Sequence, residues 1–139
     1  MLKGHMLIVA ALSAFITDPA KATCHTSNLN GVWAAYFSQQ DYFVSCTISI
    51  NASGQIISEY SQCLYQGSPK AGLISGTIGI ASASLCQYAG QISMPGPGYP
   101  YVGSFPMVNF TISKDGLVGS GLGYTGISSA LVINLVRVN

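Results

Sequence analysis

Apolar and polar residues alternate with a period of two along most of the chain after residue 30. Between residues 42 and 50, Val44, Cys46, Ile48 and Ile50 share one face, and the residues between them share the other. Successive side chains of a β-strand point to opposite faces, so this pattern predicts a strand with one buried face. We find no convincing segment with the period of 3.6 that an amphipathic helix requires. The sequence therefore predicts an all-β protein.

Turn signals recur about every ten residues and divide this region into strands. The stretches "NASGQ" after Ile50 and "SKDGL" after Ile112 each place a glycine where a tight hairpin needs a positive φ. The predicted strands cover residues 31–38, 42–50, 55–62, 71–81, 84–93, 107–113, 117–124 and 129–138. These eight consecutive strands predict an antiparallel up-and-down barrel, formed by residues 23–139 as a single domain.

The last predicted strand has an arginine in line with its apolar stripe. Leu131, Ile133 and Leu135 share one face, and Arg137 follows them in register. If the sheet closes, the start of the first strand lies beside the end of the last strand, and Arg137 meets Trp33, the only tryptophan of the chain. A guanidinium stacked on an indole contributes about 0.5 to 2 kcal/mol. We predict that this pair closes one end of the barrel and serves stability.

Gly31, Trp33 and Arg137 together form a G-x-W motif at the first strand and an arginine near the end of the last. In these residues the chain resembles the lipocalins and the wider calycin superfamily of small barrels. The bacterial metalloprotease-inhibitor type looks nearest, because its L-x-G-x-W stretch and cysteine-led strand match Leu29 to Trp33 and Cys46 onward. The resemblance implies a calycin-like barrel, and residues 23–28 would correspond to the inhibitory N-terminal arm of that type. Cys24 would tether this arm.

The first 22 residues differ from the rest of the chain. Lys3 precedes the apolar run from Met6 to Ile16, and "AKA" at residues 20–22 is a small-x-small cleavage site. This organisation predicts a signal peptide over residues 1–22 and a secreted or periplasmic product. The run is shorter than the roughly 18 residues of a spanning helix, so we expect no transmembrane segment in the mature chain.

All four cysteines follow the predicted cleavage site, and an even number in a small exported domain indicates disulfides. We predict the pairs Cys24 with Cys86, near the closed end, and Cys46 with Cys63. A regular hairpin would place Tyr60 opposite Cys46, so the third strand must bulge or bend before Cys63. The cysteine spacings lack the close pairs of a zinc ribbon, so no metal site is expected.

Charge is scarce, and this narrows the classes of function. After cleavage, three cations (Lys70, Lys114 and Arg137) balance three carboxylates (Asp41, Glu59 and Asp115), which leaves a net charge of zero. A neutral chain has no basic patch for phosphates, so we expect no nucleic-acid partner. The few titratable groups form no acid–base pair by their spacing, so the sequence predicts a protein that is not an enzyme and that uses no cofactor.

The stretch "MPGPGYPYVGSFP" at residues 94–106 is rich in proline and glycine and predicts a loop at the open end. We predict that a small apolar or weakly polar molecule binds at this mouth, in contact with five aromatic residues. They are Tyr99, Tyr101 and Phe105 on the loop, and Phe37 and Tyr60 as the inner wall. The alternatives are a protein-interaction module, such as a protease inhibitor, that contacts its partner through the 94–106 loop, and a surface structural protein without a pocket. A cavity of about 300 Å³ or more would favour the small ligand, and a filled interior would favour the interaction module.

Overall fold

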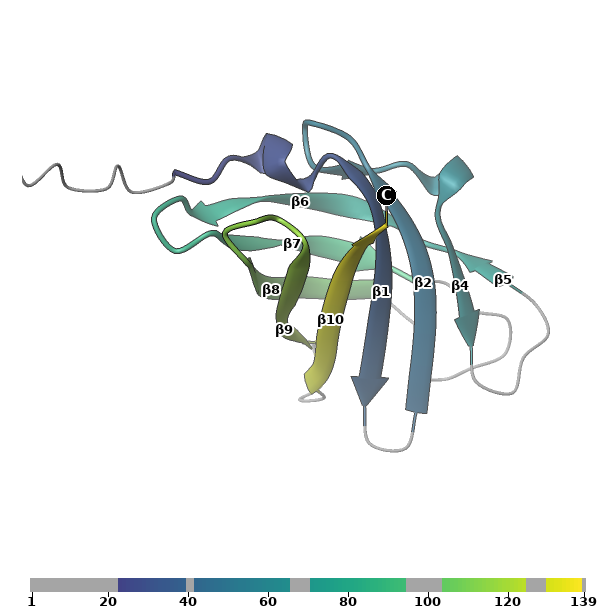
Figure 1. Ribbon diagram of the computed structural model, residues 1–139. Helices are drawn as coiled ribbons and strands as arrows, with labels where there is room; N and C mark the ends of the chain where they lie inside the picture. The colour runs from purple at the N-terminus through teal and green to yellow at the C-terminus, as the bar shows by residue number, and fades with distance from the viewer. Residues whose placement is uncertain (1–22, 40–41, 66–70, 95–103, 125–129, 139) are drawn as a thin grey trace, which may run out of the picture.

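The alternating segments form antiparallel strands in the computed structural model (Figure 1), which describes residues 23–39, 42–65, 71–94, 104–124 and 130–138. Within these residues, the strands are β1 (Gly31–Gln39), β2 (Tyr42–Ile50), β3 (Gln55–Ile56), β4 (Gln62–Tyr65), β5 (Ala71–Leu73), β6 (Ser75–Ser82), β7 (Gln87–Ser93), β8 (Ser104–Ile112), β9 (Val118–Tyr124) and β10 (Ala130–Val138). Two short 3-10 helices, η1 (Thr26–Leu29) and η2 (Ser58–Tyr60), complete the described elements. The predicted signal peptide, residues 1–22, lies outside the described residues.

The sheet closes on itself because β1 pairs with both β2 and β10. From β1 the strand order runs through β10, β9, β8, β7, β6 and β3 back to β2, and all of these pairings are antiparallel. The segments β3 and β4 together form the third strand of the barrel, and β5 and β6 form the fourth. The predicted eight-stranded antiparallel up-and-down barrel is therefore confirmed. In Figure 1, β1, β2 and β10 run down the front and cross β6, β7 and β8 behind them.

The third barrel strand bends where the second disulfide requires it. β3 ends at Ile56, and η2 inserts one tight turn before β4 begins at Gln62. This turn brings Cys63 directly opposite Cys46, with a Cα–Cα distance of 4.0 Å, and the predicted disulfide joins them. The Ser61 hydroxyl fixes the turn, because it donates to the carbonyl of Ile57 (2.8 Å) and accepts from the backbone N–H of Ser49 (2.9 Å).

Two predicted strands begin three residues away from where the structure begins them. β7 begins at Gln87 and not at residue 84, because Cys86 has a φ of 49° and belongs to the preceding turn. β8 begins at Ser104 and so includes Pro106, which the sequence predicts to lie in the 94–106 loop. Ile92 pairs with Phe105 and Gly90 pairs with Val108, so Pro106 lies in a β-bulge. A bulge leaves a residue out of the hydrogen-bond ladder, and a strand therefore tolerates proline there.

Both predicted hairpin glycines are confirmed. Gly54 and Gly116 have φ values of 82° and 72°, which glycine adopts without steric cost.

The inward faces of the strands form one core, as the alternation predicts. Its buried members include Val44, Cys46, Ile48 and Ile50 of β2, Val108, Phe110 and Ile112 of β8, and Leu131, Ile133 and Leu135 of β10.

Candidate functional site

One end of the barrel, where β1 begins and β10 ends, is closed by η1 and by the turns at residues 51–54, 83–86 and 113–117. We call it the closed end. Trp33 is fully buried there, and its indole N–H donates to the carbonyl of Leu29 at 2.8 Å. Arg137 pairs with Trp33 across β1 and β10, and its guanidinium carbon lies 4.5 Å from the centroid of the indole. The predicted contact between Trp33 and Arg137 is therefore confirmed.

The Arg137 guanidinium also binds three backbone carbonyls. It donates to Gly116 (2.9 Å), to Asn30 (2.8 Å) and to Asn28. These carbonyls belong to the 113–117 turn and to the chain around η1, so one side chain holds together segments that are distant in sequence. Gly31 makes room for it: its φ is +140°, and a Cβ atom at this position would lie 3.0 Å from the guanidinium.

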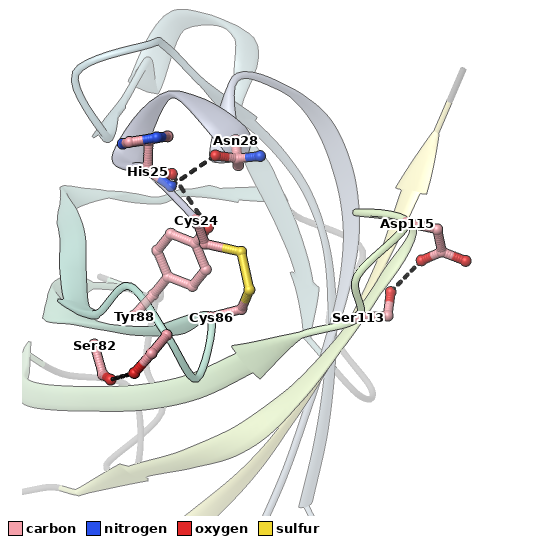
Figure 2. Close-up of a disulfide and its surroundings, with 9 residues drawn as sticks. Cys24, His25, Asn28, Ser82, Cys86, Tyr88, Ser113 and Asp115 are labelled. Atoms are coloured by element: carbon pink, nitrogen blue, oxygen red, sulfur yellow. Dashed lines mark hydrogen bonds between the residues drawn. A yellow bond between two sulfur atoms is a disulfide. The ribbon is translucent and has the colours of Figure 1, made fainter. Parts of the chain in front are cut away.

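The predicted disulfide between Cys24 and Cys86 fastens the segment before β1 to the closed end, and Figure 2 shows the Tyr88 ring beside it. The Tyr88 hydroxyl donates to the carbonyl of His25 at 3.1 Å. Burial raises the pKa of this hydroxyl above its ordinary value of 10.0, and the charge of Arg137 opposes the shift. The hydroxyl therefore stays neutral and keeps its hydrogen bond at physiological pH.

Residues 23–28, which correspond by resemblance to an inhibitory arm, are held against the barrel. Besides the disulfide, the backbone N–H of Cys24 donates to the carbonyl of Ala83 (3.1 Å). The Thr26 hydroxyl accepts from the backbone N–H of Ile80 (3.1 Å). An arm bound at three places along its length covers the closed end and is not free to extend into a partner's cleft.

The centre of the described barrel is packed. A void of only about 20 Å³ lies there, lined by apolar side chains that include Phe37, Ile78 and Ile133. A void of this size approaches the volume of one water molecule and is far below the roughly 300 Å³ of a small-molecule pocket. The void among these side chains therefore has no room for an organic ligand.

Three glycines of β9 face inward, where they could open space inside the barrel. Neighbouring side chains occupy that space instead: Ile112 and Leu135 lie 3.3 and 3.4 Å from where a Cβ atom of Gly119 would be. At Gly121 the backbone of β8 comes so close that a Cβ atom would lie 2.1 Å from the carbonyl oxygen of Asn109. The glycines therefore allow close packing of strands and side chains.

The five aromatic residues predicted to bind a ligand do not form one described site. Phe37 is buried on the inner wall, as predicted. Tyr60 is not on the inner wall: it lies in η2 with 71% of its surface exposed, because Cys63 takes the expected place opposite Cys46. Phe105 pairs with Ile92 inside the sheet. Tyr99 and Tyr101 lie outside the described residues, so a ligand at the mouth stays a prediction.

A group of exposed apolar residues lies on the outside of the barrel, across β9, β10, β1 and the beginning of β2. We call it the outer apolar face. Each of its members exposes between 38% and 49% of its surface. They are Val32, Tyr36, Phe43, Val118, Leu122, Tyr124, Val132, Val136 and Val138.

The members of the outer apolar face are neighbours through the strand register. Val138 pairs with Val32, Val136 pairs with Val118, and Val132 pairs with Leu122. The rings of Tyr36 and Phe43 stack with centroids 5.9 Å apart and extend the face onto β2. A groove of about 530 Å³ along β8, β9 and β10 includes Val118 and Val136 in its lining, so the surface is concave at this part of the face.

The opposite side of the barrel, formed by β6, β7 and β8, is polar. Its described outward positions carry Ser75, Thr77, Gly79, Gln87, Ala89, Gln91, Asn109 and Thr111. The Gln87 and Asn109 side chains bond each other there at 2.8 Å. Most of the exposed large apolar residues therefore gather on the side of β9, β10 and β1, which is typical of a contact surface, and Leu64, Leu73, Ile80 and Leu85 are exposed elsewhere.

Sequence reasoning did not identify the outer apolar face, although part of its signal is visible. In the last strand the residues between Leu131, Ile133 and Leu135 include Val132 and Val136, so both faces of that strand are largely apolar. An antiparallel strand with water on one side should alternate more strictly. The contribution of β1 depends on its pairing with β10, which only the closed sheet establishes.

Among the described residues, the outer apolar face has no acidic or basic member. Asp115 is in the 113–117 turn, where its carboxylate accepts from the Ser113 hydroxyl (Figure 2) and from the backbone N–H of Leu117 at 3.1 Å. These two bonds hold the pKa of Asp115 below its ordinary value of 3.8.

The described residues hold no group of three or more His, Cys, Asp or Glu side chains suited to a metal ion. None of the helices in the described part of the chain is long and apolar enough to cross a membrane.

No protein-family model matches this chain, and no curated protein and no solved structure matches it either. The resemblance to calycins therefore rests on Gly31, Trp33 and Arg137, and membership of that superfamily stays a prediction.

Proposed function

We propose that this chain is an exported protein-interaction module, a disulfide-linked barrel that binds through its outer surface. The packed centre of the described core carries this proposal, because the void of about 20 Å³ among Phe37, Ile78 and Ile133 holds no small organic molecule. The two disulfides support export, since such bonds persist mainly outside the reducing cytoplasm. The outer apolar face supplies the contact surface.

A first experiment asks whether anything binds inside. The exported protein is titrated with benzene while its backbone NMR signals are recorded, and the same titration is made on the Ile133→Ala variant. We expect saturable shifts at inward residues only in the variant, because removing a buried side chain opens a dry apolar cavity of the kind that takes up benzene. Saturable shifts at Phe37 or Ile48 of the unaltered protein would instead establish an interior ligand site and refute the proposal.

A second experiment asks whether the outer apolar face contacts protein. A light-activated crosslinker is placed at position 132 on this face and, as the matched control, at position 91 on the polar side. We expect protein adducts from position 132 and none from position 91. If neither position gives an adduct in the protein's own exported surroundings, the barrel is not an interaction module. Shortening residues 96–104 in the same assay tests whether the 94–106 loop contributes.

A further inference from the structure

The outer apolar face has the size of one side of a stable protein interface. Its nine members each expose between 38% and 49% of their surface, which together comes to roughly 700 Å², close to the roughly 800 Å² that each partner contributes to a standard complex. A surface of this extent is therefore large enough to bind one partner stably.

Charge restricts the chemistry of that partner. The described charged side chains are Glu59 in η2, Lys114 and Asp115 in the 113–117 turn, and Arg137, whose guanidinium is bound at the closed end. The outer apolar face itself has no charged member among the described residues. A neutral apolar face offers no charge complementarity to an acidic or basic partner, and two copies of it meet without like-charge repulsion.

The centre of the face is self-complementary. Asn134 is exposed on β10 and pairs with Tyr36 on β1 and with Ser120 on β9. An amide side chain both donates and accepts hydrogen bonds, so two Asn134 side chains related by a two-fold axis can bond each other in both directions. The valines on either side, Val132 and Val136, then pack against the same residues of the second copy.

We infer that the partner of the outer apolar face is a second copy of this chain, joined in a two-fold symmetric dimer with Asn134 near the axis. The inference rests on the proposed function, since it names the partner of the same surface. The two sheets would stack face to face about 10 Å apart, as in a β-sandwich.

The test is the oligomeric state of the exported protein, measured by sedimentation over a range of concentrations. We expect a dimer for the unaltered protein. The double variant Val132→Thr, Val136→Thr keeps β-branched side chains but adds four hydroxyl groups to the interface of the dimer. Its dissociation constant should rise on the order of 100-fold or more. The control, Leu73→Thr with Leu85→Thr, alters two more exposed apolar residues outside the face and should remain dimeric.

A cysteine variant tests the same dimer by linking its two copies covalently. Asn134→Cys places two thiols at the axis, so oxidation should link the copies covalently, whereas Gln91→Cys on the polar side should give no linked dimer. Circular dichroism and mapping of the two native disulfides verify that each variant is folded.

Each other outcome overturns the inference. A folded wild-type monomer at every concentration refutes the dimer, and so does a dimer that persists in the double variant or disappears in the control. Adducts from position 132 that contain a different protein would leave the proposed function intact and refute only the second copy. If the outer apolar face is protected only in protein that retains residues 1–22, that segment and not a second copy binds the face, and the inference is refuted.

Discussion

Trp33 and Arg137 occupy directly paired positions on β1 and β10, with the guanidinium carbon 4.5 Å from the indole centroid. These two strands are the first and the last of the chain, so the contact exists only because the barrel closes. The guanidinium continues outward to the carbonyls of Asn28, Asn30 and Gly116. One residue therefore joins the sheet, the segment around η1 and the 113–117 turn.

Replacing Arg137 with alanine should lower the free energy of unfolding by about 2 to 3 kcal/mol, through the lost cation–ring contact and the lost hydrogen bonds. Lysine at this position keeps the charge, but its single nitrogen cannot take the places of the three guanidinium nitrogens that each contact a different carbonyl, so it should recover only part of the loss. Denaturant unfolding followed by Trp33 fluorescence measures both variants. Unchanged stability and unchanged fluorescence in Arg137→Ala would contradict this role.

Gly31→Ala should destabilise the protein by about 1 to 3 kcal/mol, because its φ of +140° is strained for other residues and because the Cβ atom would crowd the guanidinium. A double-mutant cycle with Arg137→Ala separates these causes. In the Arg137→Ala background the backbone strain remains and the crowding disappears, so the cost of the glycine substitution should fall. Equal costs in both backgrounds would show that the crowding is unimportant.

Removal of either disulfide should lower the stability, but only one removal should expose Trp33 to solvent. They close loops with sequence separations of 17 and 62 residues. Chain entropy alone then predicts losses of about 3 kcal/mol for the Cys46–Cys63 pair and about 4 kcal/mol for the Cys24–Cys86 pair, each replaced by alanines. Only loss of the Cys24–Cys86 bond should release the segment before β1 and increase quenching of Trp33 by acrylamide. Equal quenching in the two variants would mean that hydrogen bonds suffice to hold this segment.

The inward glycines of β9 should tolerate no side chain where the backbone of β8 is closest. Gly121→Ala would place a Cβ atom 2.4 Å from the Cα atom of Phe110, so we expect a loss of at least about 3 kcal/mol. Gly79→Ala is the control, because the nearest atom, the Thr26 hydroxyl oxygen, is 4.0 Å from the added carbon. That variant should be nearly neutral. A stable Gly121→Ala protein would contradict the close approach of β8 and β9.

Asp115 should make stability depend on pH in the acid range. Its pKa is lowered in the folded chain, so its contribution is fully present above the ordinary value of 3.8 and is lost as the pH falls through the folded value. Asp115→Asn can still accept both hydrogen bonds, yet it does not titrate. The unfolding midpoint of the variant should therefore vary less with pH below about 4 than that of the unaltered protein. NMR titration of Asp115 with a pKa at or above its ordinary value would refute this prediction.

Local pattern alone was sufficient for much of the fold. The alternation of Val44, Cys46, Ile48 and Ile50 depends only on the two-residue period of a strand, and Gly54 and Gly116 are required by turns of a few residues. The contact between Trp33 and Arg137 followed from one further assumption, that the sheet closes. The disulfide pairs then followed from the order of the strands.

Tertiary structure decided the features that depend on several strands at once. The 3-10 turn η2 shifts the register of the third strand, so Cys63 rather than Tyr60 lies opposite Cys46, and no local pattern specifies that shift. The sequence of β9 alone does not tell whether the space beside Gly119 and Gly123 is empty or filled. In the barrel, side chains of β8 and β10 occupy that space. The outer apolar face likewise combines β9, β10 and β1, because closure places the two ends of the chain side by side. A strand's own residues specify which side chains share a face, and only the packed barrel specifies what that face meets.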